Sequence, residues 1–300
     1  MLNRSKLQRG WGLLRGLALV MLIAGCVPTA PDMVATGHVE PTEYEARLPM
    51  QTHHGTALIT ASAQGIAGRF VLDTGAALTV LDRMPLLGER LAVQSATGDE
   101  VAMVAATVET VRVGPVAFRH SYAASGDLSM LAEQIPDFLG LLGQAVLAKA
   151  NWLIDYERGE VTLRSDSRPP EGMEAVSVHY RGGLPYVVLD IDGITVEALL
   201  DSGASTYLTL PRQSSVAQRL QQKYDFVEQV KTRLTIDGAI EQRVSAGTLP
   251  VLGVGVVQRR DVPVELRDTE RPRLGARFLA AQSRIFLQGG ADIWLAAPQR

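Results

Sequence analysis

The chain contains the same segment twice, and this internal repeat limits its fold more than any other sequence feature. Residues 55–73 align with residues 183–201 without a gap at an offset of 128, so that Asp73 falls on Asp201. A second match places residues 142–163 over residues 274–295 at an offset of 132, so the second copy holds four extra residues between the two matches. Self-similarity of this kind predicts two structural units of similar fold.

Each copy has the sequence pattern of β-structure. Apolar runs flank a glycine turn at Gly65 and again at Gly193, which is the pattern of a hairpin. We therefore expect an all-β chain with two lobes, at residues 51–163 and 176–297. A polar stretch at residues 164–175 is expected to link them.

The four extra residues of the second copy are expected in the stretch from Pro211 to Phe226. Val216, Leu220 and Tyr224 recur there at intervals of four, which is the spacing of one helix face. The sequence predicts one or two short helices in all.

Both copies continue from an apolar run into an Asp-(Thr/Ser)-Gly tripeptide, and the chain has only two of these: Asp73-Thr74-Gly75 and Asp201-Ser202-Gly203. At average composition, about one in several chains of this length would contain one such tripeptide by chance. Two at equivalent places in a repeat point to a shared role. Two carboxyl groups about 3 Å apart cannot both ionise and therefore share a proton. Such a pair can activate a water with one carboxylate and supply a proton from the other.

This arrangement resembles the aspartic proteases, in particular the bacterial retropepsin-like proteins. The resemblance covers both lobes and includes the segments Leu141-Leu142-Gly143 and Arg273-Leu274-Gly275, in which Arg273 departs from the apolar pattern. It implies two retropepsin-like (acid protease) β-barrel lobes and hydrolysis of a peptide or protein substrate.

The resemblance also assigns roles to single residues. It implies that Asp73 and Asp201 are catalytic and hold a water between them. The supporting motif residues are Thr74, Gly75, Ser202 and Gly203, with the two hydroxyls bonding across to the opposite loop. Because both halves lie in one chain, we expect a monomer with an intramolecular dyad that needs no cofactor and no metal.

The family covers its cleft with a β-hairpin flap. Gly98 in the first copy and Gly238 in the second are the candidate flap tips, since glycine suits a tight hairpin turn. A plain surface hairpin remains the alternative at both places.

The N-terminus has the pattern of an export signal. Four basic residues and no acid occupy the first 15 positions, and the apolar run 16–25 is too short to span a bilayer comfortably. The run ends at Cys26, the only cysteine, in a context that resembles a bacterial lipobox. We expect residues 1–25 to be a lipoprotein signal peptide and Cys26 to be lipidated. The alternative is an ordinary signal peptide with a chance cysteine.

Residues 26–50 contain four prolines and no sustained apolar period, so we expect an extended tether. A lipidated chain would lie in the bacterial cell envelope, and the resemblance favours the outer membrane, facing the periplasm. A formal charge of −3 and 5% aromatic residues argue against nucleic acid as a partner.

Two other classes of function stay open. The same fold could bind an extended peptide or protein partner without cutting it, or it could be a structural lipoprotein that only presents a surface. The tripeptides could also be turns without chemistry.

Overall fold

The computed structural model describes residues 29–95, 100–235 and 238–296 of the chain. Strands dominate these residues, so the prediction of an all-β chain is confirmed. The described residues contain five short helices where the sequence predicted one or two. Four of the five have only four to six residues, which is too short to show a helical period in the sequence.

The elements follow one another in a similar order in the two copies. Up to residue 164 they are α1 (Ala30–Ala35), β1 (His38–Glu40), β2 (Glu45–His53), β3 (Thr56–Ala63), β4 (Ile66–Leu72), β5 (Thr79–Asp82), β6 (Glu89–Gln94), β7 (Glu100–Val113), β8 (Val116–Gly126), α2 (Ser129–Ala132), β9 (Phe138–Leu142), α3 (Gln144–Leu147), β10 (Asn151–Asp155) and β11 (Glu160–Arg164). After it they are β12 (Met173–Val176), β13 (Val178–Arg181), β14 (Leu184–Ile191), β15 (Ile194–Asp201), β16 (Leu208–Pro211), α4 (Ser215–Lys223), β17 (Phe226–Thr235), β18 (Gly238–Val254), β19 (Val257–Arg267), β20 (Arg273–Gly275), α5 (Ala276–Ala280), β21 (Arg284–Leu287) and β22 (Ile293–Ala296).

The hairpins expected around Gly65 and Gly193 are β3–β4 and β14–β15. Their registers correspond, since Leu58 lies opposite Val71 in one and Tyr186 opposite Leu199 in the other. In both copies the second hairpin strand then pairs in parallel with a short later strand, β9 or β20. The repeat seen in the sequence is therefore also a repeat of strand pairing.

The expected helix within residues 211–226 is α4, which begins after Ser214. The Ser214 hydroxyl accepts a hydrogen bond from the Ala217 N–H and so caps the first turn. The figure of four extra residues is a net value. Leu81 pairs with Ser125 in the first copy, and Thr209 pairs with Glu265 in the second. The offset between the copies is therefore 128 at the first residue of each pair and 140 at the second residue, and it returns to 132 in the second sequence match.

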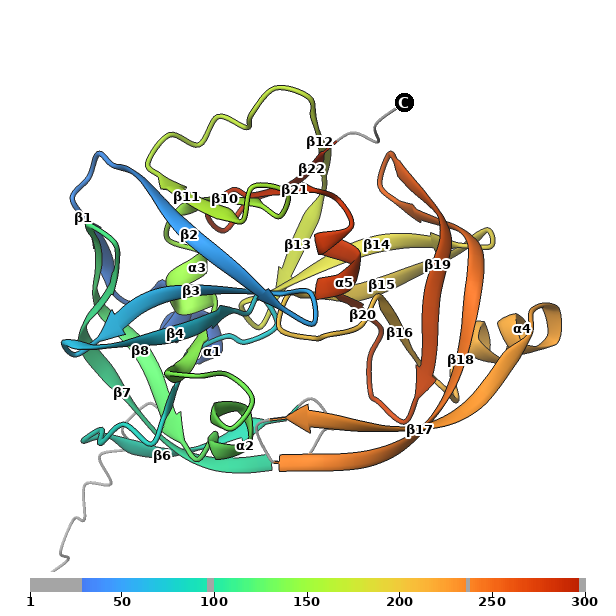
Figure 1. Cartoon of the computed structure of the whole chain (residues 1–300), viewed down its shortest axis with the longest axis horizontal. Helices are drawn as coiled ribbons and strands as arrows, with labels where there is room; N and C mark the ends of the chain where they lie inside the picture. Colours follow the sequence, from blue (N-terminus) through green and yellow to red (C-terminus); the bar gives the residue numbers. More distant parts are fainter. Residues whose placement is uncertain (1–28, 96–99, 236–237, 297–300) are drawn as a thin grey trace, which may run out of the picture.

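The strands form two sheets, and the larger one takes strands from both copies (Figure 1). Its order is β12-β22-β21-β10-β11-β2-β3-β4-β9-β5-β8-β7-β6, with β1 paired to β8. The second sheet has the order β13-β14-β15-β20-β16-β19-β18-β17. The last described strands, β21 and β22, thus pair beside β10 of the first copy and join the two halves in one sheet.

Residues 30–50 differ from the extended tether that the sequence suggested. Strand β2 pairs with both β3 and β11, and Met33 of α1 is buried in an apolar cluster. Lys149, two residues after the end of α3, holds α1 in place, because its Nζ donates to the Val34 carbonyl at 2.7 Å. The prolines permit this arrangement, since Pro31 lies in the first turn of α1.

The export signal and Cys26 lie outside the described residues. Among the residues that are described, no helix is both long enough and apolar enough to cross a membrane.

Candidate active site

The two Asp-(Thr/Ser)-Gly loops begin where two buried strands end. Asp73 directly follows β4, and its N–H donates to the Leu142 carbonyl of β9 at 2.9 Å. Asp201 is the last residue of β15 and lies opposite Gly275 of β20. In each copy a parallel strand pair therefore supports the aspartate from a matching side.

Four hydrogen bonds join the two loops to each other. The Thr74 hydroxyl donates to the Leu200 carbonyl at 2.7 Å, and the Ser202 hydroxyl donates to the Leu72 carbonyl at 2.7 Å. Each hydroxyl also accepts a backbone N–H from the other loop, at 2.9 Å from Thr74 and 3.0 Å from Ser202. Both side chains are 2% exposed, so water does not compete for these bonds. The exchange fixes one aspartate loop relative to the other.

The carboxyl groups lie against the glycines of the opposite loops. A Cβ placed on Gly75 would be 2.5 Å from Asp201 Oδ1, and one on Gly203 would be 2.5 Å from Asp73 Cγ. No residue with a side chain fits at either position. The carboxyls also accept backbone bonds from their own loops, Asp73 from Gly75 N–H at 2.9 Å and Asp201 from Ala204 N–H at 3.0 Å.

This environment favours the protonated form of Asp73. Burial, and then the neighbouring Asp201 carboxylate, raise the pKa of Asp73 to about 7. Hydrogen bonds from its own loop and the positive charge of Arg273 act in the opposite direction and are weaker. In a coupled pair the apparent pKa values belong to the pair as a whole. Here, however, the two carboxyls have different surroundings.

The difference comes from Arg273, on β20. Its Nη1 donates to Asp201 Oδ2 at 2.7 Å, and the two side chains are only 11% and 6% exposed. The equivalent residue of the first copy is Leu141, which is apolar. A buried charge-assisted bond therefore fixes one carboxylate of the pair and has no counterpart at the other.

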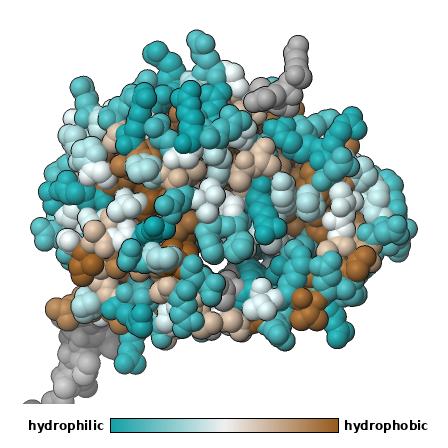
Figure 2. Space-filling view, in the orientation of Figure 1, coloured by the Kyte–Doolittle hydropathy of each residue, from teal (hydrophilic) through white to brown (hydrophobic). Residues whose placement is uncertain are grey.

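A cavity of about 890 Å³ opens over both aspartates. Its walls come from both copies, and Figure 2 shows this face of the molecule hollowed in its lower middle part. The hairpins β6–β7 and β17–β18 run toward each other along the lower side of Figure 1. Gln94 of β6 links the first hairpin to the loop between β19 and β20, because its Oε1 accepts from Arg271 Nη2 at 3.0 Å and its Nε2 donates to Glu270 at 3.2 Å.

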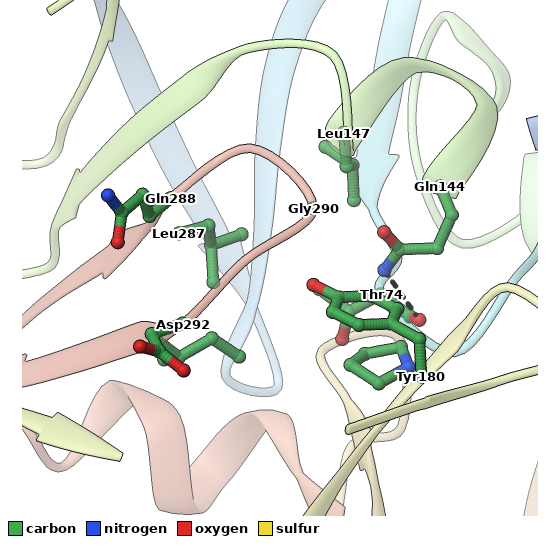
Figure 3. Close-up of a pocket in the computed structure, with 10 residues that line it drawn as sticks. Thr74, Gln144, Leu147, Tyr180, Leu287, Gln288, Gly290 and Asp292 are labelled. Carbon is green, nitrogen blue, oxygen red and sulfur yellow. Dashed lines mark hydrogen bonds between the residues drawn. The ribbon is translucent and has the colours of Figure 1, made fainter. Parts of the chain in front are cut away.

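A second, much smaller cavity of about 10 Å³ lies behind the first loop. Figure 3 shows Gln144 pointing toward Thr74, to whose carbonyl its Nε2 donates at 3.0 Å. Leu147 and Tyr180 also line this space, which has room for about one water. The side chain of Gln144 thus supports the Thr74 loop from the side opposite to the interloop bonds.

The structure brings six of the residues predicted from the motifs together: Asp73, Thr74, Gly75, Asp201, Ser202 and Gly203. The flap candidate Gly98 lies outside the described residues. Gly238 lies opposite Thr235 in the β17–β18 hairpin, with a positive φ of 123°. Among the described residues, no group of three His, Cys, Asp or Glu side chains is placed to hold a metal ion.

Sequence reasoning missed the charged side chains that β17 and β19 contribute to the cavity. Lys231 and Arg233 of β17 and Glu265 and Arg267 of β19 all line it. Alternation along β17 gave a weak signal, since Lys231 and Arg233 are two residues apart and so share a face.

Comparison with known proteins does not place the chain in a family. No protein-family model matches the sequence, and no curated protein matches it either.

Proposed function

We propose that this chain is an aspartic endopeptidase with two retropepsin-like β-barrel lobes in one chain. One observation carries the proposal: two equivalent Asp-(Thr/Ser)-Gly loops exchange four buried hydrogen bonds and place both aspartates at one cavity. Burying two neighbouring carboxyls is unfavourable for folding, and groups with pKa values perturbed in this way cluster at functional sites.

The reaction starts with the proton on Asp73 and a charge on Asp201. Asp201 takes a proton from a water as the water oxygen attacks the peptide carbonyl carbon. Asp73 gives its proton to the carbonyl oxygen, so that a neutral tetrahedral diol forms. The carbon–nitrogen bond then breaks as Asp201 passes its proton to the departing nitrogen and one diol hydroxyl returns a proton to Asp73. The products are a carboxylic acid and an amine, and the dyad ends as it began.

This assignment gives the aspartates different roles, although the repeat makes their loops alike. The ion pair with Arg273 supplies the counter-charge for ionised Asp201, while the raised pKa of Asp73 keeps a proton available near neutral pH. Interloop bonds hold the two groups in place without needing a second chain, so the proposed enzyme is active as a monomer.

The proposed site of action is the bacterial envelope. The basic and apolar residues before Cys26 support export and lipidation at that cysteine, and two or more acyl chains hold a protein stably at a membrane. An outer-membrane position facing the periplasm stays part of this proposal.

The test is cleavage of a peptide library by the purified full chain beside Asp73→Asn and Asp201→Asn. Each substitution keeps the size of the side chain and removes its acid–base function. We expect cleavage to fall by about 10²–10⁴-fold. Asp261→Asn is a matched control, because Asp261 is exposed and does not line the cavity. Cleavage that survives in both active-site variants would refute the mechanism.

A second function, peptide binding without hydrolysis, is favoured by a specific observation. Arg273 already occupies Asp201 Oδ2, an oxygen that a catalytic water would use. An inactive wild type that gains cleavage in Arg273→Met would support this second function. An active wild type would exclude it.

A further inference from the structure

The two walls of the large cavity carry opposite chemistry. The wall from the first copy is mostly apolar, with Val71, Leu78, Val80, Ile135 and Leu141 among its residues. The wall from the second copy is mostly cationic, and its charged residues include Lys231, Arg233, Glu265, Arg267, Arg271 and Arg273. The chain as a whole has a net charge of −3, so this concentration of positive charge is local.

The contrast follows from residues that occupy corresponding places in the two sheets. Strands β6 and β17 each form the edge of their sheet, beside β7 and β18. On β6, Leu91 and Val93 are two residues apart and both line the cavity. On β17, Lys231 and Arg233 have the same spacing and also line it. The two copies therefore place strands of opposite chemistry at corresponding sides of the cavity, apolar on β6 and cationic on β17.

Most of the cations on this wall already have partners. Glu265 accepts from Lys231 Nζ at 2.7 Å and from Arg267 Nε at 2.7 Å, so a single carboxylate lies between two cations. Arg273 is paired with Asp201. Arg271 donates to the Tyr186 hydroxyl at 3.1 Å and to Gln94.

Two cations on this wall are exceptions, the exposed Arg277 and Arg233, which is less exposed. The partly buried guanidinium of Arg233 forms no hydrogen bond or ion pair within residues 29–95, 100–235 and 238–296. Burial, and then repulsion from Arg273, lower the pKa of Arg233 to about 10, so it stays charged at neutral pH. A partly desolvated cation without a partner is unfavourable for folding, and an anion bound from the cavity would offset that cost.

We propose that Arg233, with Lys231 and Arg267 beside it, forms a subsite for a carboxylate side chain, and that the substrate pairs an acidic residue on one side of the cleaved bond with an apolar residue on the other. The proposal rests on the proposed endopeptidase function and names its substrate class. The guanidinium offers a planar pair of donors that matches a carboxylate. The apolar wall opposite buries a Leu, Val or Phe side chain of the same peptide.

The experiment uses end-blocked fluorogenic octapeptides, randomised at the four central positions, with the full chain. The best sequence is then made in three forms that carry Glu, Gln or Lys at the selected acidic position. We expect kcat/KM for the Glu peptide to exceed that for the Gln peptide by about 10–100-fold, the range for a hydrogen bond to a charged group. Because the ends are blocked, this preference belongs to the side chain and not to a terminal carboxylate.

Variants assign the preference to Arg233. In Arg233→Gln the Glu/Gln ratio should fall to near one, and in Arg233→Glu the preference should move toward the Lys peptide. Arg243→Gln is the matched control, because Arg243 lies exposed on the partner strand β18 and does not line the cavity. Equal cleavage of Glu and Gln peptides by the wild type, or an unchanged ratio in Arg233→Gln, would overturn the subsite.

A binding measurement separates this proposal from the proposed function. The Asp73→Asn variant is titrated with the Glu and Gln peptides by calorimetry. Tighter binding of the Glu peptide without any cleavage by wild type would support the subsite and refute the peptidase. When peptides are cut but neither rate nor affinity distinguishes Glu from Gln, the subsite fails and the peptidase stands. Neither cleavage nor selective binding would refute both.

Discussion

At Asp201, the ion pair with Arg273 places a full positive charge within hydrogen-bond distance of one carboxylate of a pair built from repeated sequence. Asp73 receives only a weaker, more distant effect of the same charge. In the proposed mechanism, Asp73 is therefore the acid and Asp201 the base. In a symmetric pair, by contrast, either carboxyl can hold the proton.

The pH profile of Arg273→Met tests this reading. A cation favours the ionised form of a nearby carboxyl, so its removal should raise the pKa of Asp73 further above its usual range. In the proposed mechanism, cleavage requires the proton on Asp73 and is lost as pH rises through that pKa. The falling limb of kcat/KM against pH should therefore move to higher pH, and the acidic limb should move the same way. Arg259→Met, outside the cavity, is the control, and an unshifted profile in Arg273→Met would show that Arg273 does not tune the dyad.

The residues of the candidate site differ in how far the sequence could predict them. Asp73 and Asp201 could be identified because a gapless repeat aligned them with their flanking Thr74 and Ser202. Arg233 could not, since β17 corresponds to β6 through sheet order and not through similar sequence. Its role depends on which face of the hairpin meets the cavity, and that is a tertiary property.

The element that matters most for the geometry is the pair of linked loops after β4 and β15. The Thr74 and Ser202 hydroxyls bond backbone groups of residues 72, 74, 200 and 202. These residues are buried, so solvent cannot replace the hydrogen bonds. The loops therefore stabilise the fold and orient the dyad at once.

Ser202→Ala should expose this double role. The change removes the hydroxyl that donates to the Leu72 carbonyl and accepts from the Thr74 N–H, and it leaves both groups buried. We expect the free energy of unfolding in urea to fall by about 2–4 kcal/mol. Thr60→Val on β3 is the control, because Thr60 is exposed and should change stability little. A loss no larger than that of the control would contradict the importance of the interloop bonds.

The hairpins and α4 could be read from local patterns, because glycine turns between apolar runs and a spacing of four are local signals. The four- to six-residue helices had no such signal. Among these helices, the position of α1 depends on Met33 being buried and on Lys149 donating to its backbone from more than a hundred residues away.

For the whole molecule, the sheet that joins the two copies decides how the chain unfolds. Strand β21 pairs with β10, with Phe286 opposite Leu153, and the Arg164 guanidinium lies 4.8 Å from the Phe286 ring centre. Strand β22 in turn pairs with β12. This pairing could not be predicted, since strands far apart in sequence carry no local signal of their partner.

We expect one cooperative thermal transition, with calorimetric and van't Hoff enthalpies that agree, because strands β12, β21 and β22 of the second copy belong to the sheet of the first copy. Phe286→Ala removes a fully buried ring from the shared sheet and should lower stability by about 3–5 kcal/mol while keeping a single transition. The exposed Val188 supplies the control Val188→Ala, which should leave the transition nearly in place. Two transitions, of which Phe286→Ala moves only one, would mean that the copies unfold independently.

The joined sheet also determines when parts of the growing chain can fold. A ribosome adding about 5–20 residues per second delivers β21 several seconds or more after β10, its neighbour in the sheet. The first aspartate loop likewise lacks its bonding partners until residues 200–202 have been synthesised. A nascent or truncated polypeptide that ends before residue 201 therefore holds only half of the proposed dyad.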